Sequence, residues 1–170
     1  VKVNTEHFEA FESPNYPILA EAGVNIKYKS SLRKKQDEEL IVHQNIANDV
    51  AILKLFPGIT IATIKAVINS AKGIVIESFG AGNAPTSPEL SALLSTSNKE
   101  GKIMINITQC LHGSAVDGQY ETSEPFGKAG VISGKDLTTE AAITKLMFLL
   151  GQGLSNEEIK AELQKNIRGE

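Results

Sequence analysis

Two patterns of apolar residues alternate along the second part of the chain, one typical of buried strands and one typical of helices. The segments 51–56, 73–78 and 102–108 are short and mainly apolar, and 73–78 is apolar in succession, which is typical of a strand covered on both faces. Between them, 61–73 and 87–101 repeat apolar residues at helical spacing. Strands and helices in this alternating order predict parallel strands that are joined by right-handed crossovers.

Later segments complete the predicted architecture. A strand at 130–133 is followed by helices at 138–152 and 155–166, and the segment 120–129 is compatible with a further short helix. We therefore predict an α/β fold, a small Rossmann-like domain of three layers in which a parallel four-stranded sheet is flanked by helices.

The predicted helices begin at residues whose side-chain oxygens can accept a backbone N–H of the first turn, namely Thr60, Ser87, Thr138 and Ser155. Glu158 completes a capping box with Ser155, and Pro88 fits the first turn of its helix. Helix capping also fully explains Asp136, Thr139 and Glu140. Gly73 and Gly101 are predicted to end the first two helices.

The beginning of the chain differs in character from the rest. It contains two prolines, one glycine and several aromatic residues, and only 24–29 alternates well enough for a short strand. We predict an interdomain connector at 1–40, resting on a neighbouring domain, and a compact domain at 41–170. An equally good interpretation of this segment is a solvated strap that covers its own domain. Because the chain begins without Met or a first strand, we expect it to be the second half of an enzyme.

Composition and charge narrow the class of protein. The 170 residues carry a net charge of -3 with mixed signs, which gives no reason to expect nucleic acid or an anionic membrane as a partner. The apolar runs are shorter than the roughly 18 residues that span a bilayer. The single cysteine, Cys110, excludes an internal disulfide and fits a reducing compartment, so we expect a soluble cytoplasmic protein.

A glycine-rich loop follows the second predicted strand. Its residues 80–85 read GAGNAP, but Pro85 stands where a dinucleotide fingerprint needs a third glycine, and the next strand ends in Asn106 and Thr108 without an acidic residue. We favour a loop whose backbone N–H groups approach a small ligand, with the Asn83 amide offering a donor and an acceptor. The alternative is a tight turn that Asn83 merely stabilises.

The end of the third predicted strand carries Thr108, Gln109, Cys110 and His112, beside that loop in a parallel sheet. A cysteine near a histidine suggests thiol chemistry, but no orienting acid is close in sequence, and two ligands are too few for zinc. We therefore expect a half-buried cysteine and a surface histidine.

Several segments together resemble one family. They are LKLFPGI, SFGAGNAP, INITQC and GVISGKDLTTEAAITKLMFLLGQ, closed by NIRGE. In this order they resemble the C-terminal domain of bacterial L-asparaginases, most closely the cytosolic type I class. The resemblance covers essentially the whole chain, with residues 1–40 similar to the interdomain connector.

The resemblance implies hydrolysis of L-asparagine to L-aspartate and ammonia without a metal or an organic cofactor. In this family an N-terminal domain supplies a threonine nucleophile, and a threonine–aspartate pair with a lysine supports proton transfer and substrate binding. Those motifs do not occur in this sequence, so we assign no catalytic residue here and expect the chain by itself to be inactive.

The resemblance also implies a homodimer or a dimer of dimers, in which the C-terminal domain completes the active site of the neighbouring subunit. On the matching positions, Asn83 reaches the substrate of that subunit. Tyr120 and Glu121 are weak signals by themselves, but they match a tyrosine–glutamate pair of part of the family, with Glu121 as an anchor for the substrate ammonium.

Some type I enzymes bind asparagine at a second, allosteric site, to which Thr108 and Cys110 correspond. Glu77 stands where an arginine would hold the carboxylate of the effector. Because a carboxylate cannot make the bidentate contact of an arginine, we expect no activation by asparagine.

Two other classes of function remain open. One is a stand-alone regulatory module that binds a small amino acid at the GAGNAP loop, and the other is a nucleotide-binding domain of Rossmann type. Threonine–glycine motifs upstream of Val1 in the reading frame would distinguish an asparaginase from the module. Thermal stabilisation by nucleotides would favour the nucleotide-binding domain.

Overall fold

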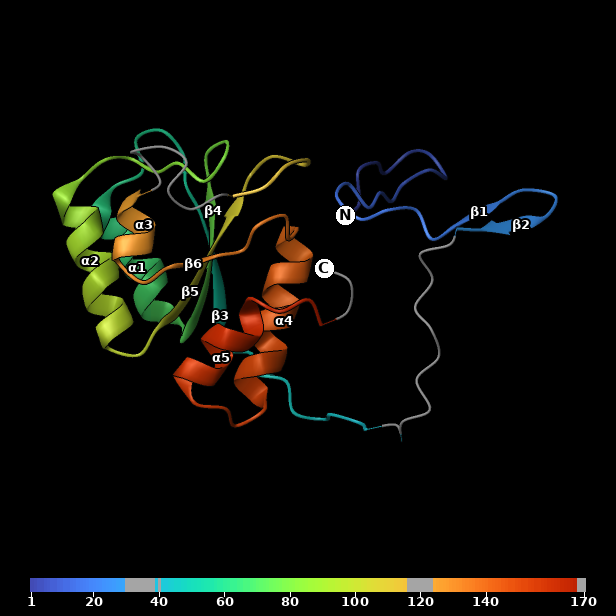
Figure 1. The fold of residues 1–170 in the computed structure, drawn as a ribbon. Coiled ribbons are helices and arrows are strands. Elements are labelled where there is room, and N and C mark those ends of the chain that lie inside the picture. The colour runs from blue at the N-terminus through green and yellow to red at the C-terminus, as the bar shows by residue number, and fades with distance from the viewer. Residues whose placement is uncertain (30–38, 40, 116–123, 168–170) are drawn as a thin grey trace. The chain divides into compact units, whose positions relative to one another are not determined.

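The computed structural model describes residues 1–29, 39, 41–115 and 124–167. Within it the chain forms two compact units, Val1–Gln44 and Asn45–Glu170 (Figure 1). In the described part of the chain, none of the helices reaches the length and hydrophobicity of a membrane span.

The first unit contains one β-hairpin. β1 (Ala20–Ala22) pairs antiparallel with β2 (Ile26–Tyr28), which confirms the short strand predicted at 24–29. An ion pair of 3.0 Å joins Lys29 Nζ to Glu21 Oε1 beside the hairpin. Every residue of the two strands is exposed, so the hairpin has no buried core of its own. The assignment of 1–40 as an interdomain connector stays a prediction.

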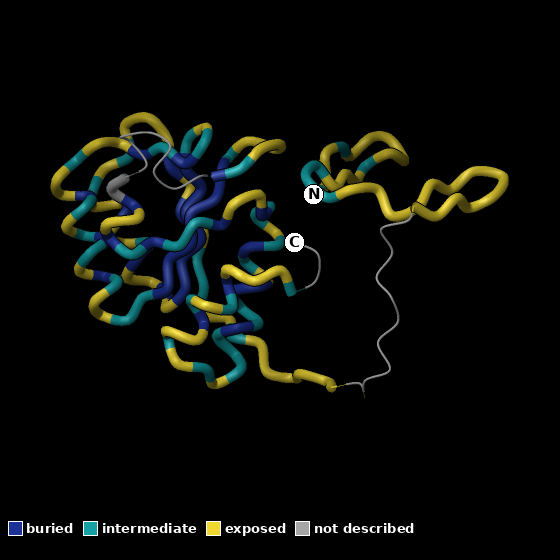
Figure 2. The backbone as a smooth tube through the Cα atoms, in the orientation of Figure 1, coloured by how far each residue is buried: buried dark blue, intermediate teal, exposed yellow. Residues whose placement is uncertain are grey.

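The second unit is built around the predicted parallel sheet, which is confirmed. Its strand order is β3-β4-β5-β6 without a reversal, and all neighbours are parallel. Every residue of the two central strands is buried, as the dark tube in Figure 2 shows. The strands are β3 (Val50–Lys54), β4 (Gly73–Ser78), β5 (Ile103–Thr108) and β6 (Ile132–Ser133).

Helices cover both faces of this sheet (Figure 1). α1, α2 and α3 pack on the face that presents Leu53, Ile76 and Met104, whereas α4 and α5 pack on the face that presents Val75 and Ile105. The two apolar cores therefore lie on opposite sides of β4 and β5. The helices are α1 (Ile61–Ser70), α2 (Pro88–Lys99), α3 (Glu124–Lys128), α4 (Thr139–Gly151) and α5 (Asn156–Leu163).

The predicted N-caps are confirmed. The side-chain oxygens of Thr60, Ser87 and Thr138 each accept the backbone N–H three residues later. Ser155 and Glu158 form the complete capping box at α5. The side-chain hydrogen bond from Ser155, and then the one from its backbone N–H, lower the pKa of Glu158 below its usual 4.5.

The role predicted for Gly73 as a helix end is wrong. α1 has its C-cap at Ala71, in extended backbone, and Gly73 is the first residue of β4. A Cβ at Gly73 would lie 2.7 Å from Leu150 Cδ1, so glycine is required by the close approach of α4 to the sheet. Gly101 does follow the C-cap of α2, with a φ of +90°, as predicted.

Candidate functional site

The loop after β4 folds back on itself as a tight turn. The backbone N–H of Phe79 donates to Asn83 O at 2.9 Å, and the N–H of Asn83 donates to Phe79 O at 2.8 Å. Gly80 and Gly82 have φ values of +48° and +107°, which favour glycine because they lie in the left-handed region. This turn presents the half-buried Asn83 at the carboxyl edge of the sheet.

Two side chains near the carboxyl end of β5 contact backbone carbonyl groups of this loop. Thr108 Oγ1 donates to Gly80 O at 2.5 Å and accepts the N–H of Cys110 at 3.0 Å. Asn106 Nδ2 lies 3.5 Å from Gly82 O, which is the long limit for such a hydrogen bond. Two successive side chains on one face of β5 therefore fix two carbonyl groups of the glycine-rich loop.

Gln109 connects three strand ends at the same edge. Its Nε2 atom donates to Leu55 O at 2.6 Å and to Glu77 O at 2.8 Å, and its backbone N–H donates to Ser78 O. Leu55 directly follows β3, and Glu77 lies near the end of β4. The Gln109 amide therefore links the carboxyl ends of these two strands. It acts as a structural link, a role that no local sequence pattern indicates.

Glu77 belongs to the opposite face of the sheet and is 7% exposed. Lys54 Nζ lies 3.2 Å from its Oε2 atom, and Thr139 Oγ1 donates to its Oε1 atom at 2.6 Å. The view that capping fully explains Thr139 is therefore wrong, since its hydroxyl bonds a side chain of β4. A buried carboxylate needs such partners, and here they come from β3 and from the start of α4.

Cys110 and His112 follow the end of β5. Cys110 is exposed, so the prediction of a half-buried cysteine is wrong, and the reason is that the chain turns away from the sheet after Thr108. His112 is exposed, as predicted. In the described parts of the chain no three His, Cys, Asp or Glu side chains gather in a way that could hold a metal ion.

Tyr120 and Glu121 lie outside the described residues. Of the sequence-predicted site residues, Asn83, Thr108 and Cys110 lie at the carboxyl edge of the sheet. The Thr108 hydroxyl accepts the N–H of Cys110 and donates to Gly80 O in the loop that carries Asn83. Their proposed roles in substrate and effector binding stay predictions.

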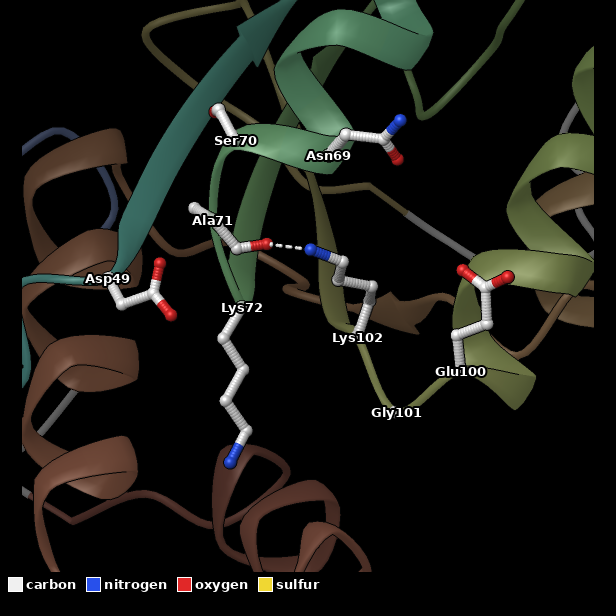
Figure 3. Close-up of a pocket in the computed structure, with 8 residues that line it drawn as sticks. All are labelled: Asp49, Asn69, Ser70, Ala71, Lys72, Glu100, Gly101 and Lys102. Atoms are coloured by element: carbon white, nitrogen blue, oxygen red, sulfur yellow. Dashed lines mark hydrogen bonds between the residues drawn. The ribbon is translucent and has the colours of Figure 1, made fainter.

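A pocket of about 280 Å³ lies at the other, amino-terminal edge of the sheet (Figure 3). Lys102 Nζ donates there to Ala71 O at 2.6 Å, and Lys72 points in another direction. The charged groups do not converge on one point, and none of the predicted site residues lines the pocket. Its lining residues are Asp49, Asn69, Ser70, Ala71, Lys72, Glu100, Gly101 and Lys102.

Comparisons with known proteins show which family and which proteins this chain resembles. Residues 49–163 match the glutaminase/asparaginase C-terminal domain family. The human 60 kDa lysophospholipase is 43% identical over 99% of this chain and 30% of its own length, and L-asparaginase 1 of Escherichia coli (strain K12) is 36% identical over 99% and 51%. The crystal structure of L-asparaginase I from Vibrio cholerae has a TM-score of 0.93 and 40% identity, covering all of this chain and 52% of that chain. The chain thus spans between 30% and 52% of the length of these three proteins.

Proposed function

The chain belongs to the glutaminase/asparaginase C-terminal domain family, and on this premise we propose that it works as the C-terminal domain of an L-asparaginase. The observation that carries the proposal is the turn at 79–83, which presents an amide side chain at the carboxyl edge of a parallel sheet. Ligands of open parallel sheets bind outside the carboxyl ends of the strands. The similarity to proteins named L-asparaginase supports L-asparagine as the ligand.

The reaction we assign to the complete protein is hydrolysis of the side-chain amide of L-asparagine to L-aspartate and ammonia. We propose that a threonine of a preceding domain attacks the amide carbon, as the resemblance to the L-asparaginases implies. Asn83 orients the substrate in the active site of a neighbouring subunit, and Glu121 with Tyr120 binds the substrate ammonium. The protein is then a cytoplasmic homodimer or dimer of dimers, a location that its single cysteine supports.

Ammonia release tests this function. We expect the complete gene product to release ammonia from L-asparagine, and the 170-residue chain, checked for folding by circular dichroism, to release none. L-Glutamine and a lysophospholipid belong in the same assay, because one relative carries the name lysophospholipase. If the complete protein releases no ammonia from L-asparagine or L-glutamine, the asparaginase assignment is wrong, and the regulatory module becomes the better explanation. Activity of the isolated chain would reveal a nucleophile within residues 1–170.

We further propose that L-asparagine does not activate this protein. The carboxylate of Glu77 is already bonded by Lys54 and Thr139, and it cannot bind the carboxylate of an effector as an arginine does. We expect the rate of the complete protein to rise hyperbolically with asparagine concentration. Sigmoidal kinetics that Thr108→Ala or Cys110→Ala abolishes would contradict this proposal.

A further inference from the structure

Asn106 is a buried polar residue whose hydrogen bonding is incomplete. It lies on β5, is 2% exposed, and has an Oδ1 atom without a hydrogen-bond partner in the described parts of the chain. Among the described residues, its Nδ2 atom has only the 3.5 Å contact with Gly82 O. A buried amide that makes one long hydrogen bond stabilises the fold little, because its desolvation is hardly compensated. An apolar side chain at this position would stabilise the core more than Asn106 does.

The contact of Asn106 reaches the peptide that carries Asn83. Gly82 O and the N–H of Asn83 belong to one planar peptide group, so they rotate together. Asn106 Nδ2 holds the carbonyl end of this plane, and Phe79 O accepts the N–H end at 2.8 Å. A tilt of the plane about the remaining contact would turn the Cα–Cβ bond of Asn83 away from its present direction.

The space around Gly82 leaves this peptide little freedom. A Cβ at Gly82 would lie 3.2 Å from Asn106 Nδ2 and 3.5 Å from the Cβ atom of Ala115. The backbone therefore rests directly on the amide of Asn106, and its φ of +107° is one that residues other than glycine rarely adopt. Loss of the Asn106 side chain would open this contact while leaving the apolar core below it in place.

We infer that Asn106 is a positioning residue, which fixes the peptide before Asn83 and so orients the Asn83 amide toward substrate. This inference rests on the proposed function, in which Asn83 contacts L-asparagine. Asn106 itself touches no substrate and acts through the Gly82–Asn83 peptide.

A double-mutant cycle in the complete gene product tests the inference. We expect Asn106→Ala to lower kcat/KM for L-asparagine about tenfold, mainly through kcat, because a small misplacement of an orienting group is costly. In the background of Asn83→Ala the same change should lower kcat/KM less than about twofold, since coupled residues are not additive. Amide hydrogen exchange at Gly82 and Asn83 should become faster, by about tenfold, in Asn106→Ala.

Asn98 on α2 offers a matched control, because it is a second asparagine with a buried Oδ1 atom that lacks a partner among the described residues. Asn98→Ala should leave both kcat/KM and loop exchange unchanged. If Asn106→Ala fails to fold, Asn106→Leu keeps the branched shape and removes the donor, with Asn98→Leu as its control. Equal losses of kcat/KM in both backgrounds, or unchanged loop exchange, would overturn the inference. A wild-type protein without asparaginase activity refutes the proposed function instead, and the exchange rates still decide whether Asn106 holds the loop.

Discussion

Asn83→Ala is expected to reduce kcat/KM for L-asparagine by about 100-fold in the complete protein, because the amide orients the substrate and alanine offers neither donor nor acceptor. The thermal midpoint should change by less than about 3 °C, as for most substitutions outside the core. Asn83 is half-buried, and its Nδ2 atom lies against the backbone of the turn, 3.9 Å from where a Cβ of Gly80 would be. The hydrogen bonds that close the turn come from the backbone and survive the substitution.

Asn69→Ala is the matched control for this experiment. Asn69 is an exposed amide at the opposite edge of the sheet, and its replacement should change neither kcat/KM nor the thermal midpoint. A large loss of stability in Asn83→Ala, with normal turnover by the remaining folded protein, would support the alternative in which Asn83 only stabilises a turn.

Gly134→Ala is expected to destabilise the protein by about 2 kcal/mol, which lowers the thermal midpoint by about 4–8 °C. The backbone N–H of Gly134 donates to Asn106 O at 2.7 Å just after β6. A Cβ there would lie 2.9 Å from the same carbonyl oxygen and 2.5 Å from Ile107 Cγ2. The backbone and a stiff β-branched side chain cannot both give way, so the pairing of β6 with β5 must loosen.

Gly127→Ala provides the comparison for thermal unfolding of the Gly134 variant. Gly127 lies in α3, and a Cβ there would meet nothing within 4 Å. Alanine is the better helix former, so this change should leave stability unaltered or raise it by up to about 1 kcal/mol. Equal thermal midpoints for the two variants would show that β6 is not held by the close contact at Gly134.

The layers of the fold could be predicted from the sequence because their signals are local. Continuous apolar runs mark the two buried central strands, and capping residues such as Thr60 and Ser155 mark helix starts within a few positions. The error at Gly73 has a different origin. Glycine ends helices often, but here a close approach of α4 requires it, and that contact joins segments far apart in the sequence.

The candidate site was predictable only in part. Asn83 stands out because glycines surround it and a buried strand precedes it. The hydrogen bonds that fix its loop join residues 24 and 28 positions apart, and those of Gln109 reach 54 positions. No short pattern reports such pairs, because they depend on the register between β4 and β5. For the same reason, the link between Thr139 and Glu77 was mistaken for helix capping alone.

The arrangement of the helices sets an order for events during synthesis. α1 and α2 are the crossovers between β3, β4 and β5, so most of the first core can form as these segments leave the ribosome, and α3 completes it with Phe126. The opposite face of the sheet, with Val75, Ile103 and Ile105, gains its cover only when α4 and α5 have been made. In that interval the nascent chain exposes an apolar sheet surface, the kind of surface that chaperones bind and that aggregates form from. A pause that holds residues 139–163 inside the exit tunnel of the ribosome would lengthen this exposure, whereas a pause after they have emerged would not.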